Sequence, residues 1–427
     1  MVTRREFVGL TSAAVAGSAC QPDNATQSDD TLPHSIAALT PIADEPTPIS
    51  VEERRGRIEK ARRLMASNNI DAMMLTGGTS LVYFTNIRWG LSERLLSIVI
   101  PATGRSFVVC PSFEEERARE QIDLGPLQGD ADIMTWHEDV NPYALVAAGL
   151  RERGIAAGRL GVEETVRFVF SDGVSREVPA LGLTSATPVT AGCRGVKDAH
   201  ELQLMRIASA VTLRAYEAAY HALQEGMTQD DFERLVSLAH QRLGFSGGAG
   251  VQVGQYSALP HGSRTPQVIR EGTILLVDGG CAVEDYLSDI SRTFVLGTPT
   301  DRMREVFEVE LRAQTAALQA ARPGVPCEDV DAAARRVIAD AGFGADYEHF
   351  THRVGHGIGM DVHEWPYLVR GNTLALAPGM TFSDEPGIYL PGEFGVRLED
   401  DMVITEDGAE LLTPQSPSLD DPFGRMV

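Results

Sequence analysis

Residues 352–364 read HRVGHGIGMDVHE, and this stretch decides the fold. Three histidines lie within twelve residues, and a glycine stands on each side of His356. Glycine lacks a Cβ, so its backbone can approach another group closely. A single histidine in such a loop is more often a structural residue. Three of them set among glycines indicate a binding site.

Two aspartates precede this stretch at the ends of predicted strands. The apolar run at 273–277 leads into Asp278, and Asp289 opens a second run at 290–296. The two runs predict strands that frame a hairpin. Either acid alone would most often be a turn residue, but two acids at paired strand ends can converge on one point.

Two glutamates follow the histidine stretch. Glu385 precedes a proline, which favours an extended backbone at the glutamate. Arg397 and Glu399 are two residues apart, so on a strand both side chains face the same way. An isolated Arg-x-Glu pair is usually a surface ion pair, so the motif gains meaning only together with the other acids.

The carboxylates of these segments require positive charge if they meet in one core. Four buried carboxylates would repel one another by several kcal/mol unless cations neutralised them. Two divalent ions balance four carboxylates. Oxygen ligands with one imidazole suit Mn, Co, Fe or Zn better than a thiolate-type site would.

Together these motifs resemble the pita-bread metallohydrolases, the family of prolidase, aminopeptidase P, methionine aminopeptidase and creatinase. The family pattern of two aspartates, one histidine and two glutamates falls on Asp278, Asp289, His356, Glu385 and Glu399. The resemblance also implies active-site roles for His261, His363 and Arg397. It further implies an α/β N-terminal domain of the creatinase/prolidase type, followed by an α+β pita-bread domain.

The resemblance implies a metal-dependent hydrolase that cleaves the amide bond before proline in a short peptide, as prolidase or aminopeptidase P does. Two divalent ions, Mn first among Mn, Co, Zn and Fe, would hold the attacking hydroxide between them. Glu385 would take up the proton, His261 and His363 would position the substrate, and Arg397 would steady Glu385 or Glu399.

Two other functions stay open on the same fold. One is a creatinase-like enzyme, or another hydrolase of a non-peptide amide or C–N bond. The other is a catalytically inactive binding homologue. An inactive homologue should have lost ligands or active-site histidines, and this chain has kept both sets.

The first 49 residues indicate a targeting signal followed by a linker. Residues 1–20 resemble a twin-arginine export signal, with Arg4 and Arg5 before an apolar run. Cys20 follows Gly-Ser-Ala and resembles a lipoprotein acylation site; the alternative is simple cleavage after Ala19. We therefore expect an exported bacterial protein, either periplasmic or anchored to the membrane by lipid. Residues 21–49 are rich in Pro, Asp, Thr and Ser and predict a flexible tether.

The remaining chain divides into two predicted domains, 50–192 and 193–427. The first shows a mixed α/β pattern. A helix is expected at 52–68, and short apolar runs that indicate strands are at 72–75, 81–84, 95–101 and 106–110.

The second domain contains a weak internal repeat, which we call the internal echo. A glycine, Gly226 or Gly324, begins each of two similar segments, and each segment leads into a helix that a glycine closes. This repetition suggests two related halves.

The composition excludes one class of partner. Sixty acidic and 37 basic residues give a net charge of −23. A nucleic-acid binder needs concentrated positive charge, so that class is not expected.

The family resemblance implies a homodimer.

Overall fold

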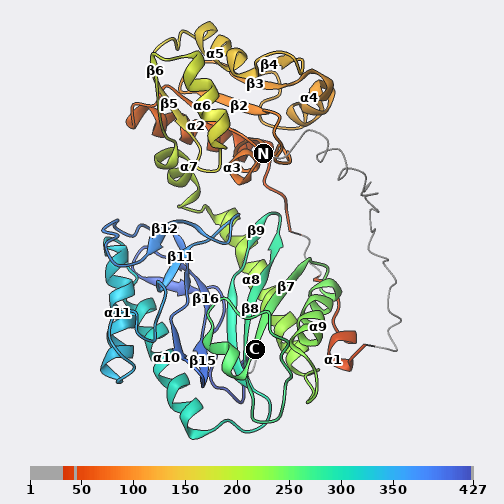
Figure 1. Ribbon diagram of the computed structural model, residues 1–427, viewed down its shortest axis with the longest axis vertical. Helices are drawn as coiled ribbons and strands as arrows, with labels where there is room; N and C mark the ends of the chain where they lie inside the picture. Colours follow the sequence, from red (N-terminus) through yellow and green to blue (C-terminus); the bar gives the residue numbers. More distant parts are fainter. Residues whose placement is uncertain (1–31, 43–45, 425–427) are drawn as a thin grey trace, which may run out of the picture.

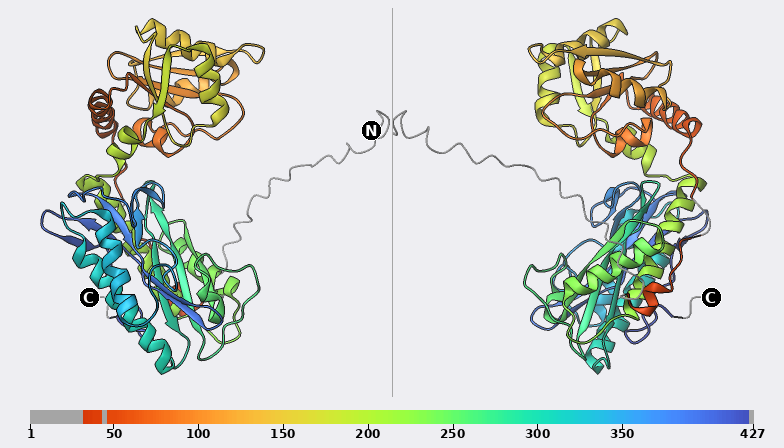
Figure 2. Two further views of the ribbon diagram at one scale, coloured as in Figure 1. Left: turned by 60° about the vertical axis from the view of Figure 1, so that its left-hand side comes forward. Right: turned by 90° about the vertical axis from the view of Figure 1, so that its right-hand side faces the viewer.

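The computed structural model describes residues 32–42 and 46–424, which form two stacked domains (Figure 1). The N-terminal domain lies at one end of the C-terminal domain in all views (Figure 2). The predicted export signal and Cys20 lie outside the described residues. Within those residues no helix is both long enough and apolar enough to cross a membrane.

The N-terminal domain is a six-stranded mixed sheet with helices around it, which confirms the predicted α/β class. Its strand order is β4-β3-β2-β1-β5-β6; the pairs β1–β2 and β2–β3 are antiparallel and the others parallel. The strands are β1 (Ala72–Leu75), β2 (Ser97–Pro101), β3 (Ser106–Pro111), β4 (Ala131–Trp136), β5 (Gly158–Val162) and β6 (Leu181–Ser185). The helices are α2 (Val51–Ser67), α3 (Thr79–Thr85), α4 (Glu115–Asp123), α5 (Pro142–Glu152), α6 (Phe168–Glu177) and α7 (Thr187–Arg194).

The apolar run at 81–84 belongs to helix α3 and not to a strand, so that prediction is wrong. Leu81 and Phe84 are both fully buried, and their spacing of three places them on one face of the helix. A four-residue apolar run fits a strand and a buried helical turn equally well, so periodicity alone could not separate them.

The C-terminal domain places antiparallel sheets between two pairs of helices (Figure 1). The sheets have the orders β10-β8-β7, with β9 paired to β8, then β12-β11-β13-β16-β17, and β14-β15. The helices are α8 (Ala199–Tyr220), α9 (Gln229–Arg242), α10 (Asp301–Ala320) and α11 (Cys327–Asp340). The strands are β7 (Gly247–Val253), β8 (Ile274–Val283), β9 (Tyr286–Leu287), β10 (Ile290–Val295), β11 (Gly355–Gly357), β12 (Glu364–Leu368), β13 (Thr381–Asp384), β14 (Gly387–Leu390), β15 (Phe394–Arg397), β16 (Asp400–Ile404) and β17 (Ala409–Leu411).

The internal echo of the sequence corresponds to α9 and α11. Each helix has 14 residues and follows a longer helix, α8 or α10. Gly226 and Gly324 precede them with φ angles of +91° and +84°, and Gly244 and Gly342 follow them with +96° and +86°. These left-handed conformations explain why glycine recurs at the same places. The arrangement supports two related halves.

Part of the predicted tether is packed against the C-terminal domain. Residues 33–42 include the short helix α1 (His34–Ala37), in which Ile36 is fully buried. The Ser35 hydroxyl donates to the backbone carbonyl of Ala218 on α8 at 2.8 Å. The prediction of a flexible tether is therefore wrong for this stretch, because its apolar side chains pack into a hydrophobic cluster together with residues of α8 and α9.

Polar contacts fix the two domains to each other. Arg57 on α2 donates to Glu201 at 3.2 Å and to the Tyr286 hydroxyl at 2.7 Å, and all three side chains are buried. At the solvent-exposed side, Arg88 pairs with Asp285 in the turn between β8 and β9.

Candidate active site

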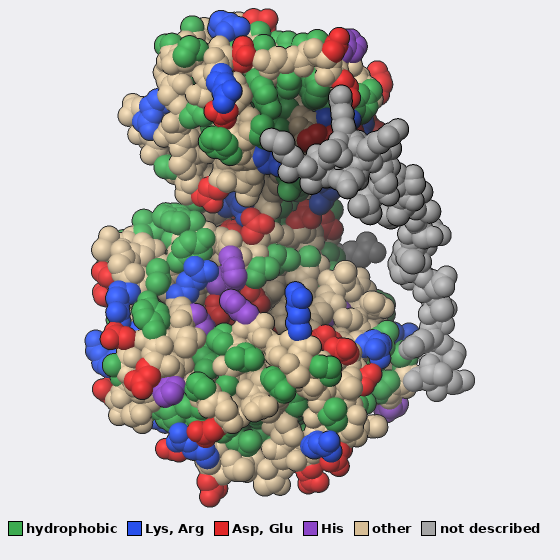
Figure 3. Space-filling view, viewed as in Figure 1, with side chains coloured by type: hydrophobic (Ala, Val, Ile, Leu, Met, Phe, Trp, Pro, Cys, Tyr) green, Lys and Arg blue, Asp and Glu red, His purple; other side chains and the backbone are tan. Residues whose placement is uncertain are grey.

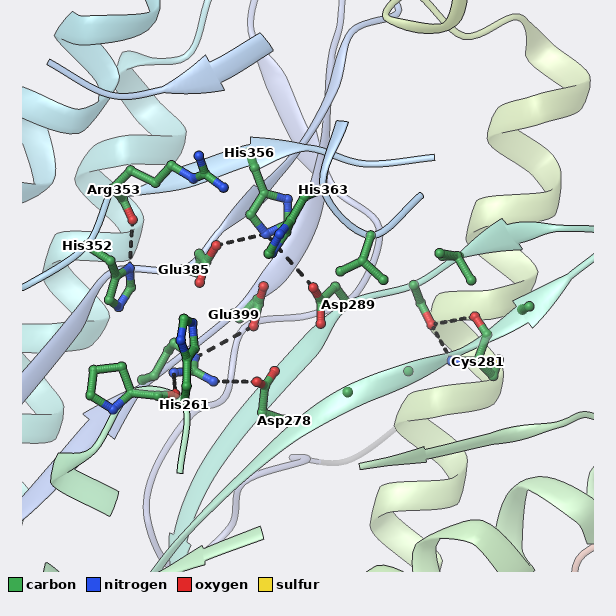
Figure 4. Close-up of a pocket in the computed structure, with 18 of the residues that line it drawn as sticks. His261, Asp278, Cys281, Asp289, His352, Arg353, His356, His363, Glu385 and Glu399 are labelled. Atoms are coloured by element: carbon green, nitrogen blue, oxygen red, sulfur yellow. Dashed lines mark hydrogen bonds and ion pairs between the residues drawn. The ribbon is translucent and has the colours of Figure 1, made fainter. Parts of the chain in front are cut away.

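A cavity of about 820 Å³ opens on the C-terminal domain, below the N-terminal domain. Histidine side chains gather at its mouth with acidic groups behind them (Figure 3). All eight residues that the sequence analysis singled out line it: His261, Asp278, Asp289, His356, His363, Glu385, Arg397 and Glu399. The close-up in Figure 4 shows seven of them by label, converging from several strands.

The two aspartates come from the predicted hairpin. Strands β8 and β10 pair antiparallel, with Asp278 opposite Ser291. Asp289 lies just before β10, and its backbone N–H donates to the carboxylate of Asp401 at 3.1 Å. The hairpin therefore brings both predicted acids to one wall of the cavity.

His356 sits in β11, between β12 and β13. A Cβ on Gly355 would lie 2.0 Å from the Ser383 carbonyl oxygen, and one on Gly357 would lie 2.7 Å from that of Glu364. These distances are too short for any side chain, so the glycines of the motif allow the three strands to pack. The packing buries His356 and aims its ring at the cavity.

Short contacts link the predicted ligands across the cavity. The His356 Nε2 atom lies 3.0 Å from Glu385 Oε1 and 3.9 Å from Asp289 Oδ2. The Ser291 hydroxyl oxygen lies 2.9 Å from Asp278 Oδ1 and 2.6 Å from Glu399 Oε2. Ser291 was not predicted, because a serine inside a strand gives no signal of this contact.

The donor set fits divalent cations. Ligand atoms of Asp289, His356 and Glu399 all lie within 4.8 Å of one another. Burial, reinforced by neighbouring carboxylates, raises the pKa of Asp289 and of Glu399 well above the usual value. Bound cations would remove this penalty on the charged forms. Asp278 and Glu385 border the same space and complete the predicted set.

Glu385 differs from its neighbours in charge state. Burial alone would raise its pKa, but the hydrogen bond and charge of His356, with help from His352 and Arg397, lower the pKa to about 2. Its carboxylate is thus ionised at neutral pH and can accept a proton. The Ser383 hydroxyl also donates to Glu385 Oε1 at 3.1 Å, which orients the group.

Arg397 holds Asp278 more closely than either glutamate. Its Nη2 lies 2.5 Å from Asp278 Oδ2, whereas its Nε lies 3.8 Å from Glu399 Oε2. The same guanidinium donates to the Pro260 carbonyl, directly before His261. The expected support of Glu385 or Glu399 is therefore joined by a stronger contact with Asp278, and Arg397 also anchors the loop that carries His261.

The two additional histidines face the same cavity. The His363 ring centroid lies 4.1 Å from that of His356. Burial, reinforced by the neighbouring His356 and Arg353, lowers the pKa of His363, so its imidazole is neutral near pH 7. His261 lies on the opposite side, in the loop after the 3-10 helix Gly254–Ala258.

The comparison with known proteins agrees with this geometry. Residues 203–406 match Metallopeptidase family M24, and residues 57–196 match the Creatinase/Prolidase N-terminal domain. The Xaa-Pro dipeptidase of Lactobacillus helveticus is 31% identical over 370 residues, which cover 85% of this chain and 98% of that protein.

Solved structures give the same result over both domains. Dipeptidase PepE from Mycobacterium ulcerans superposes with a TM-score of 0.81 at 33% identity, covering 88% of this chain and 99% of that one. The prolidase from Thermococcus sibiricus gives a TM-score of 0.76 at 28% identity, covering 86% and 98%. With its acidic cavity and both domains matched, this chain belongs to the M24 metallopeptidases that carry a creatinase/prolidase N-terminal domain.

Proposed function

We propose that this protein hydrolyses the peptide bond before proline in short peptides, as a prolidase-type dipeptidase. The observation that carries the proposal is the convergence of all eight predicted residues on one cavity. The relatives named Xaa-Pro dipeptidase and prolidase, which align with both domains, support the choice of substrate.

Divalent metal ions belong to the family, and we propose manganese for this protein. Carboxylate oxygens with one imidazole suit Mn, and also Co, Zn or Fe. Two ions would be held by Asp278, Asp289, His356, Glu385 and Glu399. Bound there, they would supply the positive charge that activates water and polarises the scissile carbonyl.

The protein groups then divide the remaining work. Glu385, ionised and oriented by the Ser383 hydroxyl, accepts the proton of the attacking water and delivers it to the leaving nitrogen. His363 is neutral and can donate a hydrogen bond to the developing tetrahedral oxygen. His261 faces it across the cavity and positions the substrate, while Arg397 keeps Asp278 in place.

The test is product release by the Mn-loaded protein from Ala-Pro, Ala-Pro-Ala and Ala-Ala. We expect cleavage of the proline substrates and none of Ala-Ala. The ratio between dipeptide and tripeptide separates a prolidase from an aminopeptidase P. Equal cleavage of Ala-Ala would contradict the specificity for proline.

Inactivity towards all three peptides would direct attention to the two other functions. If two ions per chain were bound, a creatinase-like or other non-peptide amide hydrolase would be favoured. If no ions were bound, a non-catalytic homologue would be favoured. The complete predicted ligand set and both histidines line the cavity, which supports the peptidase over the non-catalytic homologue.

We also propose that the protein is exported to the periplasm or the membrane surface. Arg4 and Arg5 before an apolar run, with Cys20 after it, support this. Mass spectrometry of the mature protein decides between the alternatives: a diacylated N-terminal Cys20 indicates a lipoprotein, and cleavage after Ala19 without lipid indicates a free periplasmic protein. An intact leader in the cytoplasmic fraction would contradict export.

We propose a homodimer on the basis of the family resemblance alone. Light scattering coupled to gel filtration should give twice the chain mass of the processed protein. A monomer mass at micromolar concentration would refute the dimer and leave the chemistry unaffected.

A further inference from the structure

We propose that Lys197 and Arg194 are positioning residues, which act through Glu364 to hold the loop that carries His363. The chain has two lysines, Lys60 and Lys197, among 37 basic residues. Lys197 is almost completely buried, in the connection between the two domains. A buried, compact cation at such a place calls for a specific partner.

The partner is the carboxylate of Glu364, the residue after His363. Lys197 Nζ donates to Glu364 Oε2 at 3.0 Å, and Arg194 donates to Glu364 Oε1. Burial would raise the pKa of Glu364, but the charges of Lys197 and Arg194 lower it to about 2. The carboxylate is therefore an anion at neutral pH that contacts two cations.

The active-site loop closes around this carboxylate. Residues 358–363 connect β11 to β12, and the backbone N–H groups of Met360 and Asp361 donate to Glu364 Oε1 at 3.0 and 3.2 Å. A Cβ on Gly359 would lie 2.8 Å from Lys197 Cε and 2.9 Å from Glu364 Oε2. The backbone thus lies directly against the ion pair, and its position depends on that pair.

The N-terminal domain reaches the same loop. Arg194 Nη2 donates to Asp361 Oδ2 at 2.6 Å, and the Thr79 hydroxyl on α3 donates to the other oxygen of Asp361. The backbone N–H of Leu287, which lines the cavity, donates to the Gly359 carbonyl at 2.8 Å. The loop is consequently held by the N-terminal domain, the interdomain connection and the cavity wall at once.

This arrangement fixes the direction of His363. Its ring reaches the cavity beside His356 only while the preceding residues keep their path around Glu364. A displacement of about 1 Å in a group that contacts substrate can lower the rate by about 100-fold. Removing the lysine charge should therefore reduce catalysis although Lys197 itself does not line the cavity.

The first experiment compares Lys197→Met with Lys60→Met in the full-length, Mn-loaded protein. We expect kcat/KM for Ala-Pro to fall about 10- to 100-fold in Lys197→Met, as for other outer partners of active-site groups. Lys60 donates to the backbone carbonyl of Cys193 at 2.9 Å and not to Glu364, so Lys60→Met should keep normal activity. An unchanged kcat/KM in Lys197→Met would overturn the proposal.

Because Lys197→Met leaves a buried carboxylate short of positive charge, it could simply impair folding. The double variant Lys197→Met/Glu364→Gln removes both charges, so it leaves no unbalanced buried carboxylate that would impair folding. We expect it to recover a melting temperature near that of the wild type but not its kcat/KM. Full recovery of both would show that charge balance, and not positioning, is what Lys197 provides.

A double-mutant cycle with His363→Ala tests the route of the effect. If Lys197 acts through His363, Lys197→Met should cost less than about 2-fold further in the His363→Ala background. A loss as large as in the wild-type background would contradict the route through His363.

The proposal rests on the proposed peptidase function, so one readout must not depend on turnover. Hydrogen exchange of residues 358–364 should be faster in Lys197→Met than in the wild type, since the Met360 and Asp361 amides bond to Glu364. If the wild type cleaved no Xaa-Pro peptide, the proposed function would fail. Hydrogen exchange would still show whether Lys197 and Arg194 hold the loop through Glu364. Unchanged exchange in this segment would refute it.

Discussion

Glu364 and Glu399 are equally buried carboxylates with opposite electrostatics. Their side chains are 4% and 2% exposed. The pKa of Glu364 is lowered to about 2, whereas burial and neighbouring carboxylates raise that of Glu399 well above the usual value. Glu364 is bonded to both Lys197 and Arg194, the second of which it shares with Asp361, while Glu399 shares the cation Arg397 with several other acids. Burial alone therefore does not mark a functional carboxylate; at the cavity, Asp289 and Glu399 have too few protein cations beside them, and we propose that metal ions supply the missing positive charge.

The largest expected effect comes from removing one of the cavity carboxylates that lie near Glu399. Asp289→Asn keeps the shape of the side chain but removes a charge and a ligand oxygen from the set formed with His356 and Glu399. We expect turnover to fall by more than about 100-fold, beyond the loss for an outer partner. Metal analysis should find fewer ions per chain.

The control is Asp285→Asn, in the turn of the same β-hairpin, where the acid pairs with Arg88 at the surface. That variant should retain both metal and activity. Full activity in Asp289→Asn would remove Asp289 from the mechanism.

The next effect is on stability and appears when metal is removed. In the metal-free folded protein, Asp289 and Glu399 keep protons that unfolded carboxylates release near pH 4. The folded state then binds more protons than the unfolded state, so its stability falls as pH rises above about 4. Each such group contributes about 1.4 kcal/mol per pH unit until its folded pKa is reached.

The measurement is the melting temperature of chelated and Mn-loaded protein between pH 5 and 8. The gap between the two should widen as pH rises, since bound cations keep the carboxylates ionised. A buried acid that does not line the cavity, such as Glu310, also has a raised pKa but affects both forms alike. A gap independent of pH would contradict the charge deficit.

The cavity residues around Glu399 were largely predictable from the sequence. Asp278 and Asp289 end up together because apolar runs revealed the hairpin β8–β10. Glycines around His356 signalled close backbone packing, and the distances at Gly355 confirm it. Local pattern and residue type carry such information, so the fold class and the cavity residues could be found before the structure.

The buried ion pair between Lys197 and Glu364 was not predictable from the sequence. Lys197 and Glu364 are 167 residues apart, and nothing local to either residue announces the pair. The Ser291 hydroxyl and the packing of Ile36 were missed for the same reason. Contacts between distant segments depend on the tertiary arrangement, which single-residue patterns do not encode.

An intermediate effect is expected at Arg397, the cation that the cavity carboxylates share. Arg397→Lys keeps the charge but cannot reproduce a fork that contacts Asp278, Ser291 and Tyr389 together. We expect metal affinity to fall about 10- to 100-fold, measured by competition with a chelator, with a smaller change in melting temperature. Unaltered affinity would show that charge alone suffices there.

The smallest effect is expected where an ion pair is exposed. Arg88 and Asp285 join the two domains near the cavity, but their side chains are 60% and 28% exposed, so water and salt screen the attraction. Arg88→Ala should cost at most about 1 kcal/mol of stability, and raising the salt concentration should erase the difference. The melting temperature in low and high salt measures both, with Lys197→Met as the buried comparison, since breaking a buried pair typically costs about 3–5 kcal/mol. If the exposed substitution proved as damaging as the buried one and insensitive to salt, burial would not be the property that separates structural ion pairs from incidental ones in this protein.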